Sequence, residues 1–180
     1  MFFALWPDRA AAARLAELAL KAQALCGGRV MRRETLHLTL AFIGEVAPER
    51  MASLRQAASR VGAQTFSLSL DRLDCWRRNG IVCAGCREPA QPLSALAGQL
   101  EAHLSAAGFA LEARSFTAHL TLLRNAQCLP LPACEAVAWP VDEFVLVESP
   151  RSSSGAGYTV VDRWPLLGSG ISPAAALESI

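Results

Sequence analysis

The sequence predicts an α+β fold, in which antiparallel or mixed sheets carry helices on their outer faces. Short apolar strands alternate with amphipathic helices along the 180 residues, and the helix-to-strand order repeats about once in each half of the chain. A histidine-containing tetrapeptide of the first half also recurs in the second half. These observations predict two pseudo-symmetric, intertwined lobes around a central cleft, with a boundary near residue 88.

Periodicity and capping residues place the elements of the first half. Asp8 is a suitable N-cap for a helix that stops at Gly27 and Gly28. Pro48 lies in the first turn of a second helix, and apolar and polar side chains alternate over 66–73 as in a half-buried strand. We therefore expect strands at 1–6, 35–43, 66–73 and 80–84, and helices at 8–26 and 48–60.

The second half repeats this arrangement. A third helix is expected at 92–107, where Gly108 ends it. Gly, Ser, Pro and Ala dominate at the end of the chain and leave little to bury, so we expect a frayed tail over 168–180. Residues 1–167 then form one two-lobed domain. The remaining strands are expected at 116–123, 137–147 (interrupted near Pro140) and 158–164.

Composition excludes several classes of protein. Hydrophobic residues make up 52% of the chain, charged residues 18%, and the mean hydropathy is +0.27, values that exclude an intrinsically disordered chain. No run of about 18 apolar residues is present, and the first residues lack the basic and apolar regions of a signal peptide. We expect a cytoplasmic protein with no membrane partner. The net charge of +1 gives no argument of its own for nucleic-acid binding.

The six cysteines are expected to be ordinary thiols. A chain of this size with no export signal is not a typical disulfide framework. Cys83 and Cys86 form a C-x-x-C motif, but it follows a short strand instead of opening a helix, where a reactive thiol would lie. The sequence offers no good second pair for a zinc site. The cysteines are Cys26, Cys75, Cys83, Cys86, Cys128 and Cys134.

The most informative feature is the repeated tetrapeptide. The sequence His-Leu-Thr-Leu at 37–40 recurs at 119–122, 82 residues later, and two of the three histidines lie in these copies. Side chains alternate between the faces of a strand, so each histidine shares a face with its threonine while the leucines face the core. Two such strands facing each other would bring two imidazoles and two hydroxyls around one pocket.

This set of side chains suits phosphodiester hydrolysis. Because the pKa of an unperturbed imidazole is about 6.5, His37 and His119 could serve as general acid and general base on opposite sides of a phosphate. The hydroxyls of Thr39 and Thr121 could donate hydrogen bonds to its non-bridging oxygens. Such a mechanism needs no metal and no other cofactor. A zinc site is the weaker alternative, because His103 lies in an expected helix without matching spacing.

The motif blocks resemble those of the two-histidine phosphoesterases, and among these the bacterial and archaeal RNA 2′,3′-cyclic phosphodiesterases, historically called 2′-5′ RNA ligases. The resemblance extends over residues 1–165 and is strongest at 34–46 and 114–124. Ala118 stands where the family usually has Pro, and Cys83 stands where relatives often carry Trp. The resemblance implies hydrolysis of RNA 2′,3′-cyclic phosphate ends.

The resemblance also implies roles for the paired residues. Water attacks the phosphorus of a terminal 2′,3′-cyclic phosphate, with His119 as proton acceptor. His37 is the proton donor to the departing 3′ oxygen, so a 2′-phosphate remains. Thr39 and Thr121 hold the non-bridging oxygens. The residues taken alone leave the order of acid and base open.

Arg124 and Phe42 are the expected substrate-binding residues. Arg124 is out of phase with His119, so its strand must bend or end near Leu123 if the guanidinium is to reach the phosphate. Phe42 is a candidate for stacking a terminal base, although its strand phase also fits a core position. Tryptophans are more typical of the core, and we place there Trp6, Trp76, Trp139 and Trp164. Candidates for following an RNA backbone are Arg29, Arg32, Arg33, Arg77 and Arg78.

The expected ligand is RNA with a 2′,3′-cyclic phosphate terminus, or a small cyclic nucleotide. We expect a monomer with no obligate protein partner. Two alternatives remain: ATP-independent 2′-5′ RNA ligation at the same site, and a non-catalytic RNA- or nucleotide-binding module. The second explains the two histidines poorly, since binding alone does not require paired acid–base groups.

Overall fold

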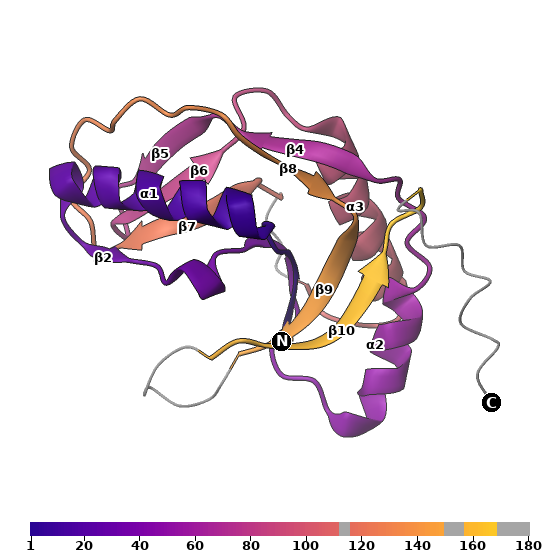
Figure 1. The fold of residues 1–180 in the computed structure, drawn as a ribbon. Helices are drawn as coiled ribbons and strands as arrows, with labels where there is room; N and C mark the ends of the chain where they lie inside the picture. The colour runs from indigo at the N-terminus through magenta and orange to yellow at the C-terminus, as the bar shows by residue number, and fades with distance from the viewer. Residues whose placement is uncertain (112–115, 150–156, 169–180) are drawn as a thin grey trace.

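The computed structural model describes residues 1–111, 116–149 and 157–168, so nearly all of the expected tail lies outside the described residues. Helices and strands follow the expected order (Figure 1). The elements are β1 (Phe2–Leu5), α1 (Arg9–Cys26), β2 (Arg29–Val30), the short 3₁₀ helix η1 (Arg33–Thr35), β3 (Leu38–Phe42), a second 3₁₀ helix η2 (Pro48–Arg50), α2 (Met51–Ala58), β4 (Phe66–Leu70), β5 (Arg72–Trp76), β6 (Ile81–Gly85), α3 (Gln91–Ala106), β7 (His119–Arg124), β8 (Val137–Val141), β9 (Glu143–Glu148) and β10 (Thr159–Pro165).

One large antiparallel sheet organises the described residues. Its strands follow the order β10-β9-β1-β3-β7-β6-β5, with β2 also paired to β7, and β4 and β8 form a separate antiparallel pair. The order interleaves the two halves of the chain, because β1 and β3 lie beside β9 and β10 while β7 lies beside β6 and β5. The predicted α+β class is confirmed. The lobe boundary near residue 88 stays a prediction.

The two strands that carry the repeated tetrapeptides are neighbours in this sheet. β3 and β7 run antiparallel and pair at a single position, Leu38 opposite Leu120. β2 pairs with the same edge of β7 as β3 does, but nearer the C-terminal end of β7, where Arg29 pairs with Arg124 and Val30 with Leu123. The large sheet is therefore joined at its centre by the two strands on which the sequence places the candidate site.

The leucines of both tetrapeptides are buried and belong to the main core. α1 contacts β7, and α3 contacts β3 and α2; in Figure 1 α1 lies across one part of the sheet and α2 and α3 lie together at the other. The expected N-cap of α1 is confirmed, because the Asp8 carboxylate accepts a hydrogen bond from the Ala11 amide at 2.7 Å. Leucines that these elements contribute to the main core include Leu15, Leu38, Leu40, Leu54, Leu96, Leu100, Leu120 and Leu122.

Two expected strands are each divided, and the division has one cause. The chain passes from the small sheet to the large sheet at Asp71, between β4 and β5, and at Asp142, between β8 and β9. The break in the second strand was expected at Pro140, but Pro140 lies inside β8 opposite Ser67. An alternating pattern of apolar and polar residues continues through such a change of sheet. Periodicity alone therefore predicted one strand in place of β4 and β5, and one in place of β8 and β9.

The strand expected at 35–43 is shorter than predicted. Residues 33–35 form η1, and β3 begins only at Leu38. The Thr35 hydroxyl donates to the Arg32 carbonyl at 2.7 Å, a local bond that favours a turn over an extended backbone. His37 therefore directly precedes the strand that the sequence placed it in.

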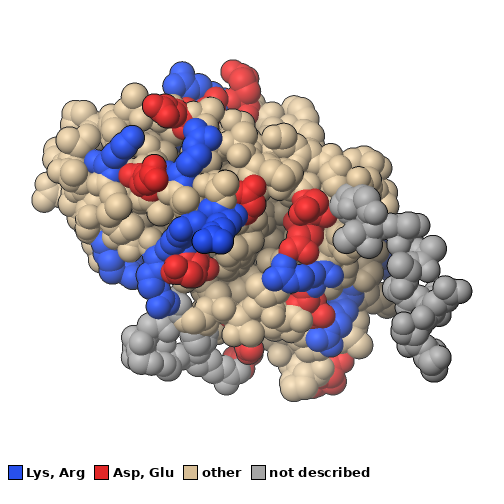
Figure 2. Space-filling model, in the orientation of Figure 1, with Lys and Arg blue, Asp and Glu red and all other residues tan. Residues whose placement is uncertain are grey.

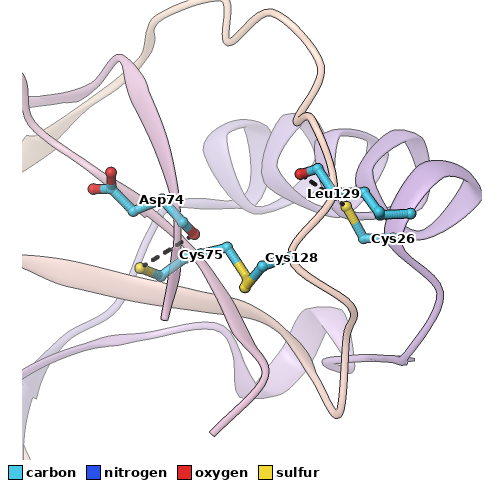
Figure 3. The surroundings of a disulfide bond; sticks show 6 residues. Cys26, Asp74, Cys75, Cys128 and Leu129 are labelled. Atoms are coloured by element: carbon cyan, nitrogen blue, oxygen red, sulfur yellow. Dashed lines mark hydrogen bonds between the residues drawn. A yellow bond between two sulfur atoms is a disulfide. The ribbon is translucent and has the colours of Figure 1, made fainter. Parts of the chain in front are cut away.

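The expectation that every cysteine is a free thiol was wrong for one pair. Cys75 at the end of β5 is bonded to Cys128, 53 residues later in the segment that follows β7 (Figure 3). Their proximity depends on how β5, β6 and β7 pair, which no local spacing reveals. Cys83 is free and buried as expected, and burial raises the pKa of its thiol to about 12. Within the described ranges, no helix is long and apolar enough to cross a membrane.

Candidate active site

The antiparallel register brings the two histidine–threonine pairs together. Leu38 lies opposite Leu120, so the next position on each side sets His37 across from Thr121 and Thr39 across from His119. Diagonal neighbours on one face of an antiparallel pair lie about 7–8 Å apart. The two imidazoles thus lie diagonally across one small patch of the sheet, as the repeated tetrapeptide predicts.

Both imidazoles are held by the same backbone hydrogen bond. Nδ1 of His37 lies 2.7 Å from the carbonyl oxygen of Thr35, and Nδ1 of His119 lies 2.8 Å from that of Thr117. A carbonyl oxygen can only accept, so Nδ1 carries the hydrogen in both rings. Nε2 of each ring is then the nitrogen left to accept or donate a proton.

His37 is enclosed by aromatic rings. Trp6 stacks on it with centroids 5.2 Å apart, and Phe2 and Tyr158 lie at 4.9 and 5.1 Å. This burial lowers the pKa of His37; the hydrogen bond to the Thr35 carbonyl opposes the shift, and the positive charge of Arg124 adds to it, with a further contribution from the second imidazole. In the free protein the neutral form of His37 is therefore favoured.

His119 opens onto a cavity of about 430 Å³. Trp76 packs against its ring, with the centroids 4.5 Å apart. The described residues that line the cavity come from β3, the end of β5, α3, the segment between α3 and β7, and the start of β7: Thr39, Leu40, Ala41, Phe42, Trp76, Glu101, Leu111, Phe116, Thr117 and His119.

One of the four tryptophans was placed wrongly by the sequence. Trp76 packs against His119 instead of the core. Trp6 packs against the smaller core cluster, as expected, and also stacks on His37. Trp139 is buried in the core and Trp164 packs against it, as expected. A usable signal was present for Trp76, because Arg77-Arg78 follows it directly, and such polar neighbours are typical of a strand end.

Arg124 reaches the histidine face because β7 contains an irregularity. Val82 of β6 pairs with Leu123, yet the next residue of β6 pairs with Thr121, so Leu122 is an extra residue in β7. Leu122 and Leu123 are both buried in consequence, and Arg124 is exposed. This confirms the bend that the sequence required near Leu123. The positive charge of Arg124 is also one of the causes of the lowered pKa of His37.

Among the arginines that are candidates for following an RNA backbone, Arg29 pairs with β7, the strand that carries His119. It lies directly opposite Arg124 in the β2–β7 ladder, so the two side chains share one face. Arg33 instead donates to the Arg9 carbonyl at 2.6 Å. On the face drawn in Figure 2, basic and acidic side chains are interspersed, with a group of basic ones around α1. The nearly balanced total charge of the chain is thus also locally mixed on this face.

Phe42 ends β3 and is half exposed, with 50% of its surface accessible, on the wall of the cavity. Of the two placements considered for Phe42, the structure supports the one beside the site. The zinc alternative has no assembled ligand set within the described ranges, since no three His, Cys, Asp or Glu side chains there are grouped to hold a metal ion. The chemical roles of all these residues stay predictions.

Paired histidines on adjacent antiparallel strands of an α+β fold define a two-histidine phosphoesterase. The chain belongs to the LigT-like phosphoesterase family, whose model matches residues 5–83 and 85–158. It is 36% identical over 142 residues to the RNA 2′,3′-cyclic phosphodiesterase of Escherichia coli K12, covering 77% of this chain and 80% of that protein. It is 33% identical over 152 residues to the Geobacillus stearothermophilus protein of the same name, covering 77% of this chain and 48% of the relative.

Solved structures show the same fold. The crystal structure of Escherichia coli LigT complexed with 3′-AMP matches with a TM-score of 0.84 and 32% sequence identity, covering 92% of this chain and 97% of that one. A crystal structure of a Thermus thermophilus protein matches with a TM-score of 0.74 and 27% identity, over 93% of this chain and 98% of that one. These comparisons confirm the family resemblance that the motif blocks carry.

Proposed function

We propose that this protein hydrolyses RNA 2′,3′-cyclic phosphate ends to 2′-phosphate ends. The observation that carries the proposal is the pair of imidazoles on adjacent antiparallel strands, each fixed through Nδ1 by a backbone carbonyl. Family membership supports it, as does the name RNA 2′,3′-cyclic phosphodiesterase that the relatives bear. The proposed mechanism uses neither a metal nor another cofactor.

In the proposed reaction, His119 accepts a proton through Nε2 from a water molecule that attacks phosphorus. The bond from phosphorus to the 3′ oxygen breaks, and His37 donates its Nε2 proton to that oxygen, so a 2′-phosphate and a free 3′-hydroxyl remain. The hydroxyls of Thr39 and Thr121 donate to the non-bridging oxygens. The Arg124 guanidinium stabilises the negative charge that develops there.

The lowered pKa of His37 has to be reconciled with its role as proton donor. The free protein favours the neutral ring, because the aromatic enclosure excludes water. A bound cyclic phosphate brings a negative charge beside that ring, and a neighbouring opposite charge favours the protonated form of an imidazole. Substrate binding thus favours the uptake, from the solvent, of the proton that His37 then donates.

The proposal is tested with a short RNA that ends in 2′,3′-cyclic phosphate. Wild type and His119→Ala are incubated with it in the presence of EDTA, and the products are separated chromatographically. We expect a 2′-phosphate from wild type alone. A 3′-phosphate product would reverse the leaving oxygen, and activity that EDTA abolishes and added metal restores would contradict the metal-independent mechanism.

The same assay addresses the finer expectations. An RNA with a 5′-hydroxyl, added without ATP, detects 2′-5′ joining as a longer product. Binding of the labelled RNA without any turnover would instead support the non-catalytic module. We propose further that the protein acts as a cytoplasmic monomer, and light scattering during size-exclusion chromatography tests the oligomeric state.

A further inference from the structure

The cavity beside His119 has a carboxylate on its wall. Glu101 projects from α3, and it is the one acidic residue among the described residues that line the cavity. It is exposed, and within the described ranges it has no hydrogen bond or ion pair. A carboxylate that faces a cavity with both oxygens available is an acceptor for two neighbouring donors.

Two phenylalanines flank the same cavity. Phe42 is the last residue of β3, Phe116 lies three residues before β7, and both line the cavity. Phe42 is half exposed and Phe116 partly exposed. Unpaired bases are commonly bound by stacking on such rings. The volume of about 430 Å³ lies within the usual range of small-molecule sites.

We infer that this cavity receives the terminal nucleobase and that Glu101 makes it selective for guanine. The inference rests on the proposed function, because the cavity shares His119 and Thr39 with the candidate active site. Guanine presents a ring N–H and an amino group side by side on its pairing edge. The two carboxylate oxygens of Glu101 can accept from both at once, as a carboxylate does from the parallel donors of arginine.

The other three bases match this carboxylate less well. Adenine and cytosine each present an amino group beside a ring nitrogen that can only accept, so one oxygen of Glu101 would face a lone pair. Uracil presents one N–H between two carbonyl oxygens. A site built for a pair of donors discriminates against bases that leave one of its acceptors unpaired.

The experiment compares the four 2′,3′-cyclic mononucleotides as substrates of wild type and Glu101→Gln. Wild type is expected to prefer the guanosine substrate by about 10- to 100-fold in kcat/KM, the effect of a hydrogen bond to a charged group. Glu101→Gln replaces one acceptor with a donor, so it should remove most of this preference and leave the uridine substrate within about threefold of wild type. Glu49→Gln is the matched control, because Glu49 is exposed on η2 and does not line the cavity.

The outcomes separate the inference from the proposed function. Equal hydrolysis of all four substrates would overturn the inference and leave the proposed function standing. An equal gain on all four in Glu101→Gln would mean that Glu101 only repels the phosphate, which also overturns it. If none of the four mononucleotides is hydrolysed, the RNA assay above decides the proposed function. Binding of 2′-GMP and 2′-UMP, followed by the fluorescence of Trp76 in the cavity wall, then tests the guanine preference without catalysis.

Discussion

The two copies of the histidine motif make the same hydrogen bond to the backbone, but their surroundings differ. In both, Nδ1 of the imidazole donates to the carbonyl two residues earlier, and a tryptophan packs against the ring. His37, however, lies inside an aromatic enclosure that lowers its pKa, whereas His119 borders an open cavity. A repeated sequence can thus fix two side chains alike while their surroundings prepare them for different chemistry.

Removing either imidazole should have the largest effect on the proposed reaction. His37→Ala and His119→Ala are each expected to lower the rate by about 10²- to 10⁴-fold, since each would lose a general acid or base. The double variant should lose less than the product of the two, because the two groups act in one step. His103→Ala, in α3, is the control and should retain wild-type activity. A near-wild-type rate in either single variant contradicts the two-histidine assignment.

Arg124 and Arg29 offer a second comparison, because they face the same side of the β2–β7 ladder. Arg124→Gln should slow hydrolysis of a cyclic mononucleotide by about 10²-fold, the usual effect of removing one donor that stabilises developing charge. Arg29→Gln should leave that rate unchanged. On an RNA substrate it should weaken binding and reduce the dependence of log affinity on log salt by about one unit. Equal losses in both variants on the mononucleotide would show that both arginines contact the reacting phosphate.

The order of acid and base is best resolved with single variants. In wild type the reactive pair carries one proton, and the bell-shaped pH profile is the same whichever ring holds it. In His119→Ala the residual rate depends on His37 alone. If His37 is the acid, that residual kcat/KM should fall tenfold per pH unit above the lowered pKa of His37, which lies below the usual value of about 6.5. A residual rate that rises with pH through this range would make His37 the base.

The site was predictable from the sequence where it depends on strand geometry. Alternation along a strand placed each histidine with its threonine and buried the intervening leucines. The phase argument for Arg124 required a bend near Leu123, and the structure has the irregularity at the adjacent Leu122. Strand phase is a local property, so a motif of four residues carries it. The same reasoning did not decide whether Phe42 stacks on a base or lies in the core, because the exposure of a strand's last residue depends on which segment packs against it.

The features that the sequence missed depend on contacts between distant segments. Trp6 and Trp76 reach the histidines only because β1 lies beside β3 and β5 lies near β7 across β6. The bond between Cys75 and Cys128 depends on the same pairing. Hydrophobic periodicity reports which face of an element is buried, but it does not report which element covers that face.

The smallest expected effect concerns folding stability, and it follows from the lowered pKa of His37. Above the unfolded-state value of about 6.5 the ring is neutral in both states, so stability is unaffected. As the pH falls below 6.5 the unfolded chain binds a proton before the folded protein does, and stability is lost until the pH passes the lowered pKa of His37 in the folded state. The melting temperature of wild type should therefore fall more between pH 7.5 and 5.5 than that of His37→Gln, which keeps a polar side chain but does not titrate. Equal decreases in the two proteins would show that the aromatic enclosure does not favour the neutral ring.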